Sequence, residues 1–392
     1  MNILLVHDFY QNVGGEDLAA LSDKKLLEGH GQNVLFYRRD NQEIDTYSFG
    51  KKIVLPFNTI YSLRTRQEIS DIVRQFRPDV AYVHNFFPLI SPSIYDTLHR
   101  LNVPIVQVVH DFRFICPNGL FYTHGAICER CKRGNYLHAV RNRCYRNSYP
   151  ASIAAASVIG IGRVAGMLDK ISAFVCLTEF SKMKLSEAGI PLRKIFVKPH
   201  GIDISGIRPD FENGRHVLFL GRLTPEKGIW TLVRAFTQLS EVPLKIAGSG
   251  ILEQEVREYI KERKLRNIEM VGFKVGAEKW DLLLSSWFVV VPSEWYETFC
   301  LVVIEAYAAG KAVIGSNVGS LPFVIEHGRS GLLFKTGDNI DLQEKITRLL
   351  NNPCERRTMG MYGRGVASSK YDPESVYQLL MTIFDRAANQ LS

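Results

Sequence analysis

Short apolar runs recur along this chain, separated by stretches whose apolar residues repeat with the period of a helix. Buried strands of a parallel sheet are continuous apolar runs, and their alternation with helices is typical of sheets with helices on both faces. The pattern predicts an α/β fold with two doubly wound sheets. The candidate strands are residues 2–7, 33–37, 80–84, 105–109, 174–177 and 195–198 in the first half, and 217–220, 244–247, 268–271, 288–291, 312–315 and 332–334 in the second.

A stretch rich in glycine and proline, residues 199–209, separates the two series of strands. Such residues interrupt regular elements and are typical of a domain boundary. We expect a first domain of residues 1–200 and a second of residues 201–372, followed by a last helix over 373–392.

Polar residues and glycines follow several of the candidate strands. Ligands of doubly wound sheets bind beyond the carboxyl ends of the strands, so these positions are candidate site residues. A plain strand-to-helix turn is the alternative for the first glycine pair, and a structural role is the alternative for the histidines. The positions are Gly14-Gly15, His84-Asn85, His110-Asp111, Gly221-Arg222 and Gly248-Ser249-Gly250.

The segment 221–228 has the residue types of a phosphate site. Arg222 can direct two donors at a phosphate, and Lys227 adds a second positive charge. The glycines allow backbone N–H groups to approach the ligand, and a helix that begins at Gly228 would point its positive end at the same place.

Glu297 and Glu305 are separated by seven residues in a largely apolar segment. If the segment were helical, a rise of about 1.5 Å per residue would place them roughly 12 Å apart. The two carboxyl groups of a glycoside hydrolase lie closer, at about 5–9.5 Å. The spacing instead suits two hydroxyl-rich ends of one ligand, a sugar at Glu297 and a ribose at Glu305. The alternative is that both are solvated helix charges.

The composition is that of an ordinary globular protein of 392 residues, with 46% hydrophobic and 22% charged residues. The N-terminus enters the apolar run 3–6 at once, without the basic region and cleavage site of a signal peptide, so we expect a cytoplasmic protein. The longest nearly apolar stretch, residues 151–162, is shorter than the roughly 20 residues of a membrane span. It predicts a core helix.

The formal charge of +8 is concentrated in one segment, residues 113–146, which contains seven Lys or Arg residues and one acid. Aromatic residues are interspersed among these cations. A basic, aromatic segment suits an anionic lipid surface at the inner face of the membrane, or a lipid-linked diphosphate acceptor. Nucleic acid and a solvated basic loop are the alternatives.

Four of the seven cysteines lie in this basic segment, at Cys116, Cys128, Cys131 and Cys144. A pair separated by two residues, with two outer cysteines, is a typical spacing for a tetrahedral zinc site. We therefore expect a structural zinc ion that orders the insertion at about residues 112–146. The alternative is buried free cysteines, which is the interpretation we favour for Cys176, Cys300 and Cys354.

Taken together, these motifs resemble family 4 of the glycosyltransferases, and the cysteine cluster points to a subgroup with a four-cysteine insertion. This family comprises retaining, metal-independent enzymes of the GT-B fold that use nucleotide-diphospho-sugars. The resemblance extends over nearly the full length. It is carried by Gly14-Gly15, His110-Asp111, Gly201 with Asp203, Arg222, Lys227, Gly248-Ser249-Gly250, Glu297-Thr298-Phe299, Glu305-Ala306 and Ala309-Gly310.

The resemblance implies two Rossmann-like domains that face each other across a cleft, with the last helix crossing back to the first domain. It implies catalytic roles for His110, Arg222, Lys227 and Glu297, without a catalytic metal. The acceptor side would include Asp111, His84 and Asn85. The donor and its nucleotide would bind at Gly14, Gly15, Gly248, Ser249, Gly250, Phe273, Lys274, Thr298, Phe299 and Glu305.

We therefore predict a retaining glycosyltransferase of surface-polysaccharide or lipopolysaccharide synthesis that acts on a glycan or lipid-linked acceptor at the membrane. A nucleotide-sugar epimerase or a phosphorylase of the same fold is the first alternative. A zinc-knuckle nucleic-acid-binding protein is the second, but such a protein has no use for Arg222, Lys227, Glu297 and Glu305 together, so we expect no nucleic-acid partner.

Overall fold

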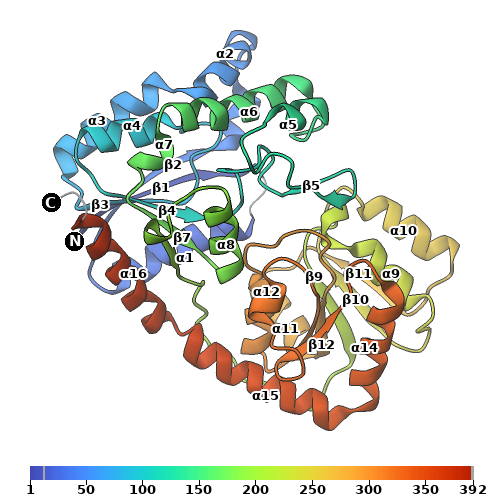
Figure 1. Cartoon of the computed structure of the whole chain (residues 1–392). Helices are drawn as coiled ribbons and strands as arrows, with labels where there is room; N and C mark the ends of the chain where they lie inside the picture. Colours follow the sequence, from blue (N-terminus) through green and yellow to red (C-terminus); the bar gives the residue numbers. More distant parts are fainter. Residues whose placement is uncertain (12–13, 390–392) are drawn as a thin grey trace. The chain divides into compact units, whose positions relative to one another are not determined.

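The computed structural model describes residues 1–11 and 14–389 of the chain (Figure 1). The chain divides into two compact units. The first comprises Met1–Thr123, Cys128–Pro199 and Val376–Ser392, and the second comprises His124–Ile127 and His200–Ser375. The main division between Pro199 and His200 falls in the stretch rich in glycine and proline.

The first unit is built on a six-stranded parallel sheet with the strand order β2-β1-β3-β4-β7-β8. Each central strand is buried along its length, which is why it is a continuous apolar run in the sequence. The strand order reverses between β1 and β3. The strands are β1 (Asn2–Phe9), β2 (Asn33–Asp40), β3 (Val80–Val83), β4 (Ile105–Val109), β7 (Ala173–Cys176) and β8 (Ile195–Val197).

Helices follow the strands of the first unit and cover its sheet (Figure 1). The segment 112–146 contains only a small two-stranded sheet and one short helix. The helices are α1 (Gly15–Gly29), α2 (Phe49–Ile60), α3 (Leu63–Phe76), α4 (Ser93–Arg100), α5 (Leu137–Arg141), α6 (Tyr149–Val164), α7 (Met167–Lys170) and α8 (Glu179–Glu187), with 3-10 turns η1 (Asn41–Thr46) and η2 (Leu192–Lys194); the short strands are β5 (Tyr122–Thr123) and β6 (Ala126–Ile127).

The second unit repeats the architecture, with the strand order β11-β10-β9-β12-β13-β14 and all neighbours parallel. Its order reverses between β9 and β12. The strands are β9 (His216–Leu220), β10 (Leu244–Ala247), β11 (Ile268–Gly272), β12 (Ser286–Val291), β13 (Ala312–Ser316) and β14 (Gly331–Phe334); the helices are η3 (Pro225–Lys227), α9 (Ile229–Phe236), α10 (Glu253–Glu262), α11 (Gly276–Leu284), α12 (Leu301–Ala308), α13 (Leu321–Val324), α14 (Asn339–Asn351) and α15 (Pro353–Lys370).

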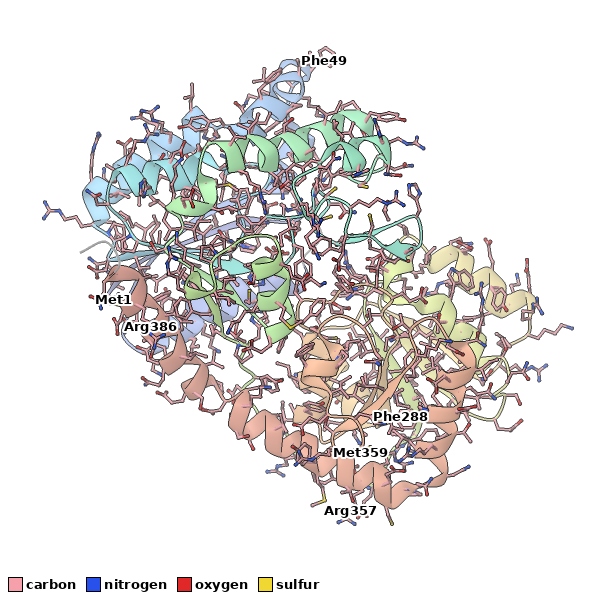
Figure 2. All side chains as sticks on the ribbon, in the orientation of Figure 1. Met1, Phe49, Phe288, Arg357, Met359 and Arg386 are labelled. Carbon is pink, nitrogen blue, oxygen red and sulfur yellow. The ribbon has the colours of Figure 1, made fainter. Side chains whose placement is uncertain are left out.

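One hydrophobic cluster packs one face of this second sheet against helices α9, α10, α14 and α15. It includes Phe288 of β12 and Met359 of α15, both labelled in Figure 2. Two sheets of parallel strands with intervening helices are the doubly wound architecture that the apolar runs predict, and all twelve predicted strands are present.

The last helix, α16 (Pro373–Ala388), packs on the first unit. Tyr377 stacks on His30 with ring centroids 3.7 Å apart, and its hydroxyl accepts a hydrogen bond of 2.8 Å from Gln32. Phe384 meets the ring of Tyr82 edge-on at 5.1 Å. These contacts attach the end of the chain to the unit in which it begins.

The helix over residues 151–162 differs from the prediction. It forms most of α6, but only one face is buried, and Ile153 and Ile161 are exposed. The prediction of a core helix was therefore wrong for the exposed side of α6. Because nearly all residues of this segment are apolar, their spacing along the chain does not show which face of the helix is exposed to water. None of the helices within residues 1–11 and 14–389 is long and apolar enough to cross a membrane.

Candidate active site

The predicted site residues of the second unit follow the carboxyl ends of its central strands. Arg222 comes after β9, the segment 248–250 after β10, and Glu297 after β12. The strand order reverses between β9 and β12, and doubly wound sheets bind their ligands at such a reversal.

The glycines of segment 248–250 pack against the loop that follows β9. A Cβ atom on Gly248 would lie 1.8 Å from the carbonyl oxygen of Gly221, and one on Gly250 would lie 2.4 Å from that of Leu223. The backbone N–H of Leu223 donates to Ser249 at 2.9 Å. Glycine is therefore required at both positions, because a side chain would collide with the neighbouring backbone. This requirement is independent of the predicted approach of a phosphate.

Gly228 lies where the loop after β9 contacts the loop after β12. Its φ is +68°, it is the N-cap of α9, and a Cβ atom there would lie 1.8 Å from the carbonyl oxygen of Pro292. The N–H of Glu294 donates to the carbonyl of Glu226 at 2.8 Å. The helix start predicted at this glycine is present, and the glycine also allows the two loops to meet.

Lys227 and Glu297 form an ion pair between these two loops. Nζ of Lys227 lies 2.6 Å from Oε1 of Glu297, and the same oxygen accepts a hydrogen bond of 2.7 Å from the hydroxyl of Ser293. Glu297 is 4% exposed, and the ammonium group lies 5.2 Å from the ring centroid of Trp295. The sequence predicted separate contacts, phosphate for the lysine and sugar for the glutamate, whereas the structure pairs the two side chains directly.

Arg222 remains accessible. Its side chain is 61% exposed, and its nearest acid is Glu226, with 3.3 Å between Nη2 and Oε1. Glu226 is only 10% exposed, but the guanidinium group lies largely in water, where an ion pair contributes little stability, so it can turn toward a ligand.

Glu305 lies on α12, whereas Glu297 precedes that helix. The predicted separation of roughly 12 Å assumed a continuous helix, so it does not apply to this pair. Oε1 of Glu305 accepts a hydrogen bond of 2.7 Å from Lys279 of α11. A carboxylate offers about four acceptor positions, so this ion pair is compatible with a hydroxyl ligand at the same group.

The other residues predicted to bind the nucleotide-sugar differ in how far their side chains are exposed. Phe273 follows β11 and is 64% exposed, and its neighbour Lys274 pairs with Glu278 at 2.9 Å. Thr298 and Phe299 are buried. Phe299 packs edge-on against His200, with ring centroids 5.3 Å apart, so its side chain belongs to the packing and only its backbone is suited to contact a ligand.

In the first unit, the predicted residues His84, Asn85, His110 and Asp111 line one small cavity with Glu16 and Arg113. The two histidines are joined by a hydrogen bond of 2.9 Å between Nδ1 of His84 and Nε2 of His110. Asp111 accepts hydrogen bonds from the backbone and the guanidinium group of Arg113, at 2.8 and 3.0 Å. The structure therefore brings together residues from the ends of two neighbouring strands.

A buried polar network extends from the histidine pair into the protein. Asp23 of α1 accepts hydrogen bonds of 2.7 Å from the Tyr82 hydroxyl and from Lys198, whose side chain is completely buried. Nε2 of His84 lies 3.7 Å from the same aspartate oxygen. The network fixes the ring of His84, and through it the ring of His110.

Gly14 is the N-cap of α1, which fits the alternative of a plain turn into the helix. Its N–H donates to Asp17 at 2.7 Å, and that carboxylate also bonds His7 at 2.7 Å. Burial and the negative charge of Asp111 raise the pKa of the neighbouring Glu16, which accepts a hydrogen bond of 2.8 Å from Tyr10.

The four clustered cysteines line one small cavity together with His138. However, among the residues that the structure describes, no three His, Cys, Asp or Glu side chains are grouped so that they could hold a metal ion. The predicted zinc site and the subgroup defined by it are therefore not supported. Cys116 instead donates to Asn118 at 3.0 Å and Cys144 to Thr123 at 3.6 Å, and burial raises the pKa of Cys116 to about 11 and that of Cys131 to about 12.

The sequence did not lead us to predict Glu16, Asp23 or Lys198 as part of the cavity of the first unit and its buried network. Lys198 ends an apolar strand and precedes a proline, which gives no hint of a partner 175 residues away. Glu16 directly follows the glycine pair, so its position at the start of α1 was the only available signal.

The chain matches two sequence profiles of known protein families. Residues 28–205 match the profile described as Glycosyltransferase Family 4, and residues 204–366 match that of Glycosyl transferases group 1. Together the two matches span residues 28–366.

Two relatives illustrate the similarity in sequence. An uncharacterized glycosyltransferase of Methanocaldococcus jannaschii is 32% identical over 198 residues, which cover 50% of this chain and 54% of that protein. The chain thus spans about half the length of this relative. An uncharacterized 42.6 kDa protein in the cps region of Klebsiella pneumoniae is 23% identical over 351 residues, which cover 82% of this chain and 86% of that protein.

Two solved structures share the fold. HepE of Anabaena, solved in complex with UDP, gives a TM-score of 0.70 at 18% identity, covering 98% of this chain and 100% of that one. The lipopolysaccharide outer core galactosyltransferase WaaB, in its apo form, gives 0.65 at 14% identity, covering 98% and 99%. This similarity in fold confirms the predicted GT-B class.

Proposed function

Because the chain belongs to the glycosyltransferases of family 4 and group 1, we propose that it is a retaining enzyme that transfers a sugar from a nucleotide-diphospho-sugar to a glycan or lipid-linked acceptor. We place this reaction in surface-polysaccharide or lipopolysaccharide synthesis, at the inner face of the cell membrane. The relative in the cps region and the fold shared with WaaB support this context.

The ion pair between Lys227 and Glu297 is the observation that carries the proposal. It places a cation and a carboxylate at the reversal of strand order between β9 and β12. The cation can bind the diphosphate, and the carboxylate can accept hydrogen bonds from sugar hydroxyls. One nucleotide-sugar molecule can therefore contact both groups. Since HepE was solved with UDP, the UDP-sugars are the first donors to test.

In the proposed mechanism, Arg222 and Lys227 bind the diphosphate and offset the negative charge that grows on it as the bond to the sugar breaks. Glu297 orients the sugar through its hydroxyls, and Glu305 binds the ribose. The acceptor hydroxyl forms the new bond, and its proton passes to an oxygen of the leaving diphosphate. No side chain serves as a covalent nucleophile, and no metal ion takes part.

We assign the other half of the proposed chemistry to residues that line the cavity of the first unit. His110, with its ring held by the network through His84 and Asp23, would contact the donor sugar. Asp111 and Asn85 would bind the acceptor, since their polar groups line the same cavity.

A thermal-shift panel of nucleotide-sugars tests the donor assignment. A ligand at 100 times its dissociation constant stabilises the folded state by about 2.7 kcal/mol, so the true donor raises the melting temperature. NMR of the product with that donor should show the anomeric configuration of the donor retained. An inverted product would overturn the retaining assignment, and an altered free nucleotide-sugar without transfer would identify an epimerase.

A further inference from the structure

Helix α2 turns apolar side chains toward solvent. Phe49 is 81% exposed, Ile53 55% and Phe57 70%, and Figure 2 shows Phe49 projecting at the outer end of this helix. At 3.6 residues per turn these three positions fall within an arc of about 80°, so they form one face. A surface helix of a globular protein normally presents a polar face to water, whereas α2 exposes these apolar residues beside Lys51 and Lys52.

Helix α6, which packs beside α2, has the same character. Its buried face consists mainly of small residues, whereas Tyr149, Ile153, Ile161 and Val164 are exposed, the last at 93%. These four positions share one side of the helix, within an arc of about 120°. We call the exposed apolar residues of both helices the α2–α6 surface. A monomeric protein rarely exposes so many neighbouring apolar residues unless something binds them.

The segments that carry this surface contain no acidic residue. Residues 46–67, which include α2, contain four Lys or Arg residues and no Asp or Glu. Residues 130–168, which include α6, contain seven Lys or Arg residues and no Asp or Glu. Lys51 and Lys52 are exposed within α2 itself, beside the apolar face. The occupant of the surface must therefore offer both apolar and anionic groups.

We propose that the α2–α6 surface binds an anionic lipid bilayer. The exposed aromatic and aliphatic side chains would enter the boundary between headgroups and acyl chains, and the surrounding cations would contact lipid phosphates. A second copy of the chain is the competing occupant, but two acid-free cationic surfaces repel each other. Through this surface the proposed function, transfer to a lipid-linked acceptor, would take place, so the assignment rests on that function. The surface adds the apolar residues of α2 and α6 to the membrane contact predicted from the basic segment 113–146.

Flotation with lipid vesicles tests the inference on the full chain. We expect the protein to float with vesicles of phosphatidylglycerol and phosphatidylcholine and to remain unbound with phosphatidylcholine alone. Phe57→Glu should weaken binding about 10- to 100-fold, because burying one such side chain is worth that factor. Leu192→Glu is the matched control, since Leu192 is exposed to 61% in the same unit but belongs to neither helix, and it should leave binding unchanged.

The charge contribution is tested with Lys51→Ala and Lys52→Ala. Each should weaken binding to the anionic vesicles about fivefold, the factor for one cation near such a surface, and high salt should have the same effect. Circular dichroism checks that every variant is folded.

Three results would overturn the inference. In the first, the wild-type protein does not bind anionic vesicles, and in the second, Phe57→Glu binds them as tightly as wild type. In the third, sedimentation shows a wild-type dimer that Phe57→Glu converts to a monomer. Transfer to a water-soluble acceptor is measured on the same preparations. Lost vesicle binding with intact transfer refutes only the membrane surface, and absent transfer with intact vesicle binding refutes only the proposed function.

Discussion

The ion pair between Lys227 and Glu297 makes the two side chains energetically dependent on each other. Their atoms lie 2.6 Å apart, and their side chains are only 19% and 5% exposed. Removing one partner of a buried pair costs about 3–5 kcal/mol, because the remaining charge stays buried alone. Since Lys227 keeps some contact with water, we take the lower part of this range.

Lys227→Ala should therefore lower kcat/KM by roughly 10² to 10³, as the loss of one preorganised donor does in other enzymes. In the proposed mechanism, the variant loses the contact to the diphosphate, and it leaves the carboxylate of Glu297 without its lysine partner beside a negatively charged ligand. Glu297→Gln removes that repulsion. In the Lys227→Ala background, Glu297→Gln should consequently cost nothing or restore activity, although alone it slows the enzyme.

The assay is a double-mutant cycle on kcat/KM, which should give a coupling energy of about 1–3 kcal/mol. The control cycle uses Arg257→Ala and Glu253→Gln, an exposed pair on α10 with a distance of 2.8 Å. Its coupling should be below about 0.5 kcal/mol. Strictly additive effects of Lys227→Ala and Glu297→Gln would refute the claim that the pair acts as a unit.

The remaining predictions concern Arg222, Glu305, the need for a metal ion, and Asp8, a buried residue of β1. Arg222→Ala should lower kcat/KM by roughly 10² to 10³ without changing the melting temperature, because its exposed side chain contributes to ligand binding and not to packing; an unchanged rate would exclude it from the phosphate site. Glu305→Gln should weaken nucleotide binding in calorimetry more than it slows turnover, and an unchanged affinity would contradict the ribose role. Activity should persist in EDTA, whereas loss that Mg²⁺ restores would show that the reaction needs a metal. Burial raises the pKa of Asp8 from 3.8 to about 7. Protonated Asp8 therefore stabilises the folded state fully below about pH 3.8, and this stabilisation is lost as the pH rises through 7. The melting temperature of Asp8→Asn relative to wild type should increase between pH 4 and 8, and a constant difference would refute the raised pKa.

The sequence by itself determined the fold class and the sheet edge at which the candidate site residues lie. Buried parallel strands have to be apolar on both faces, so β3, β4, β9 and β12 were recognisable as apolar runs, and their ends identified the candidate residues. The start of α9 at Gly228 was predictable for a similarly local reason, because a glycine can adopt the positive φ that the helix entry needs.

The tertiary structure decided which residues meet. Lys227 and Glu297 are 70 residues apart, and Lys198 and Asp23 are 175 residues apart, so no local pattern joins either pair. The glycines of segment 248–250 are explained by a neighbouring backbone that the sequence does not reveal. Likewise, the spacing of the four cysteines suggested a zinc site that the structure does not support.

The direction in which an apolar face points was also decided by the tertiary structure. The sequence shows that α2 is rich in apolar residues and that α6 is nearly apolar, and the usual assumption is that apolar faces pack inward. In α2 and α6, however, large apolar side chains are exposed to solvent, among them Phe57 and Val164. Periodicity depends only on the chain itself, whereas burial depends on which other elements cover the helix, and that is a property of the whole fold.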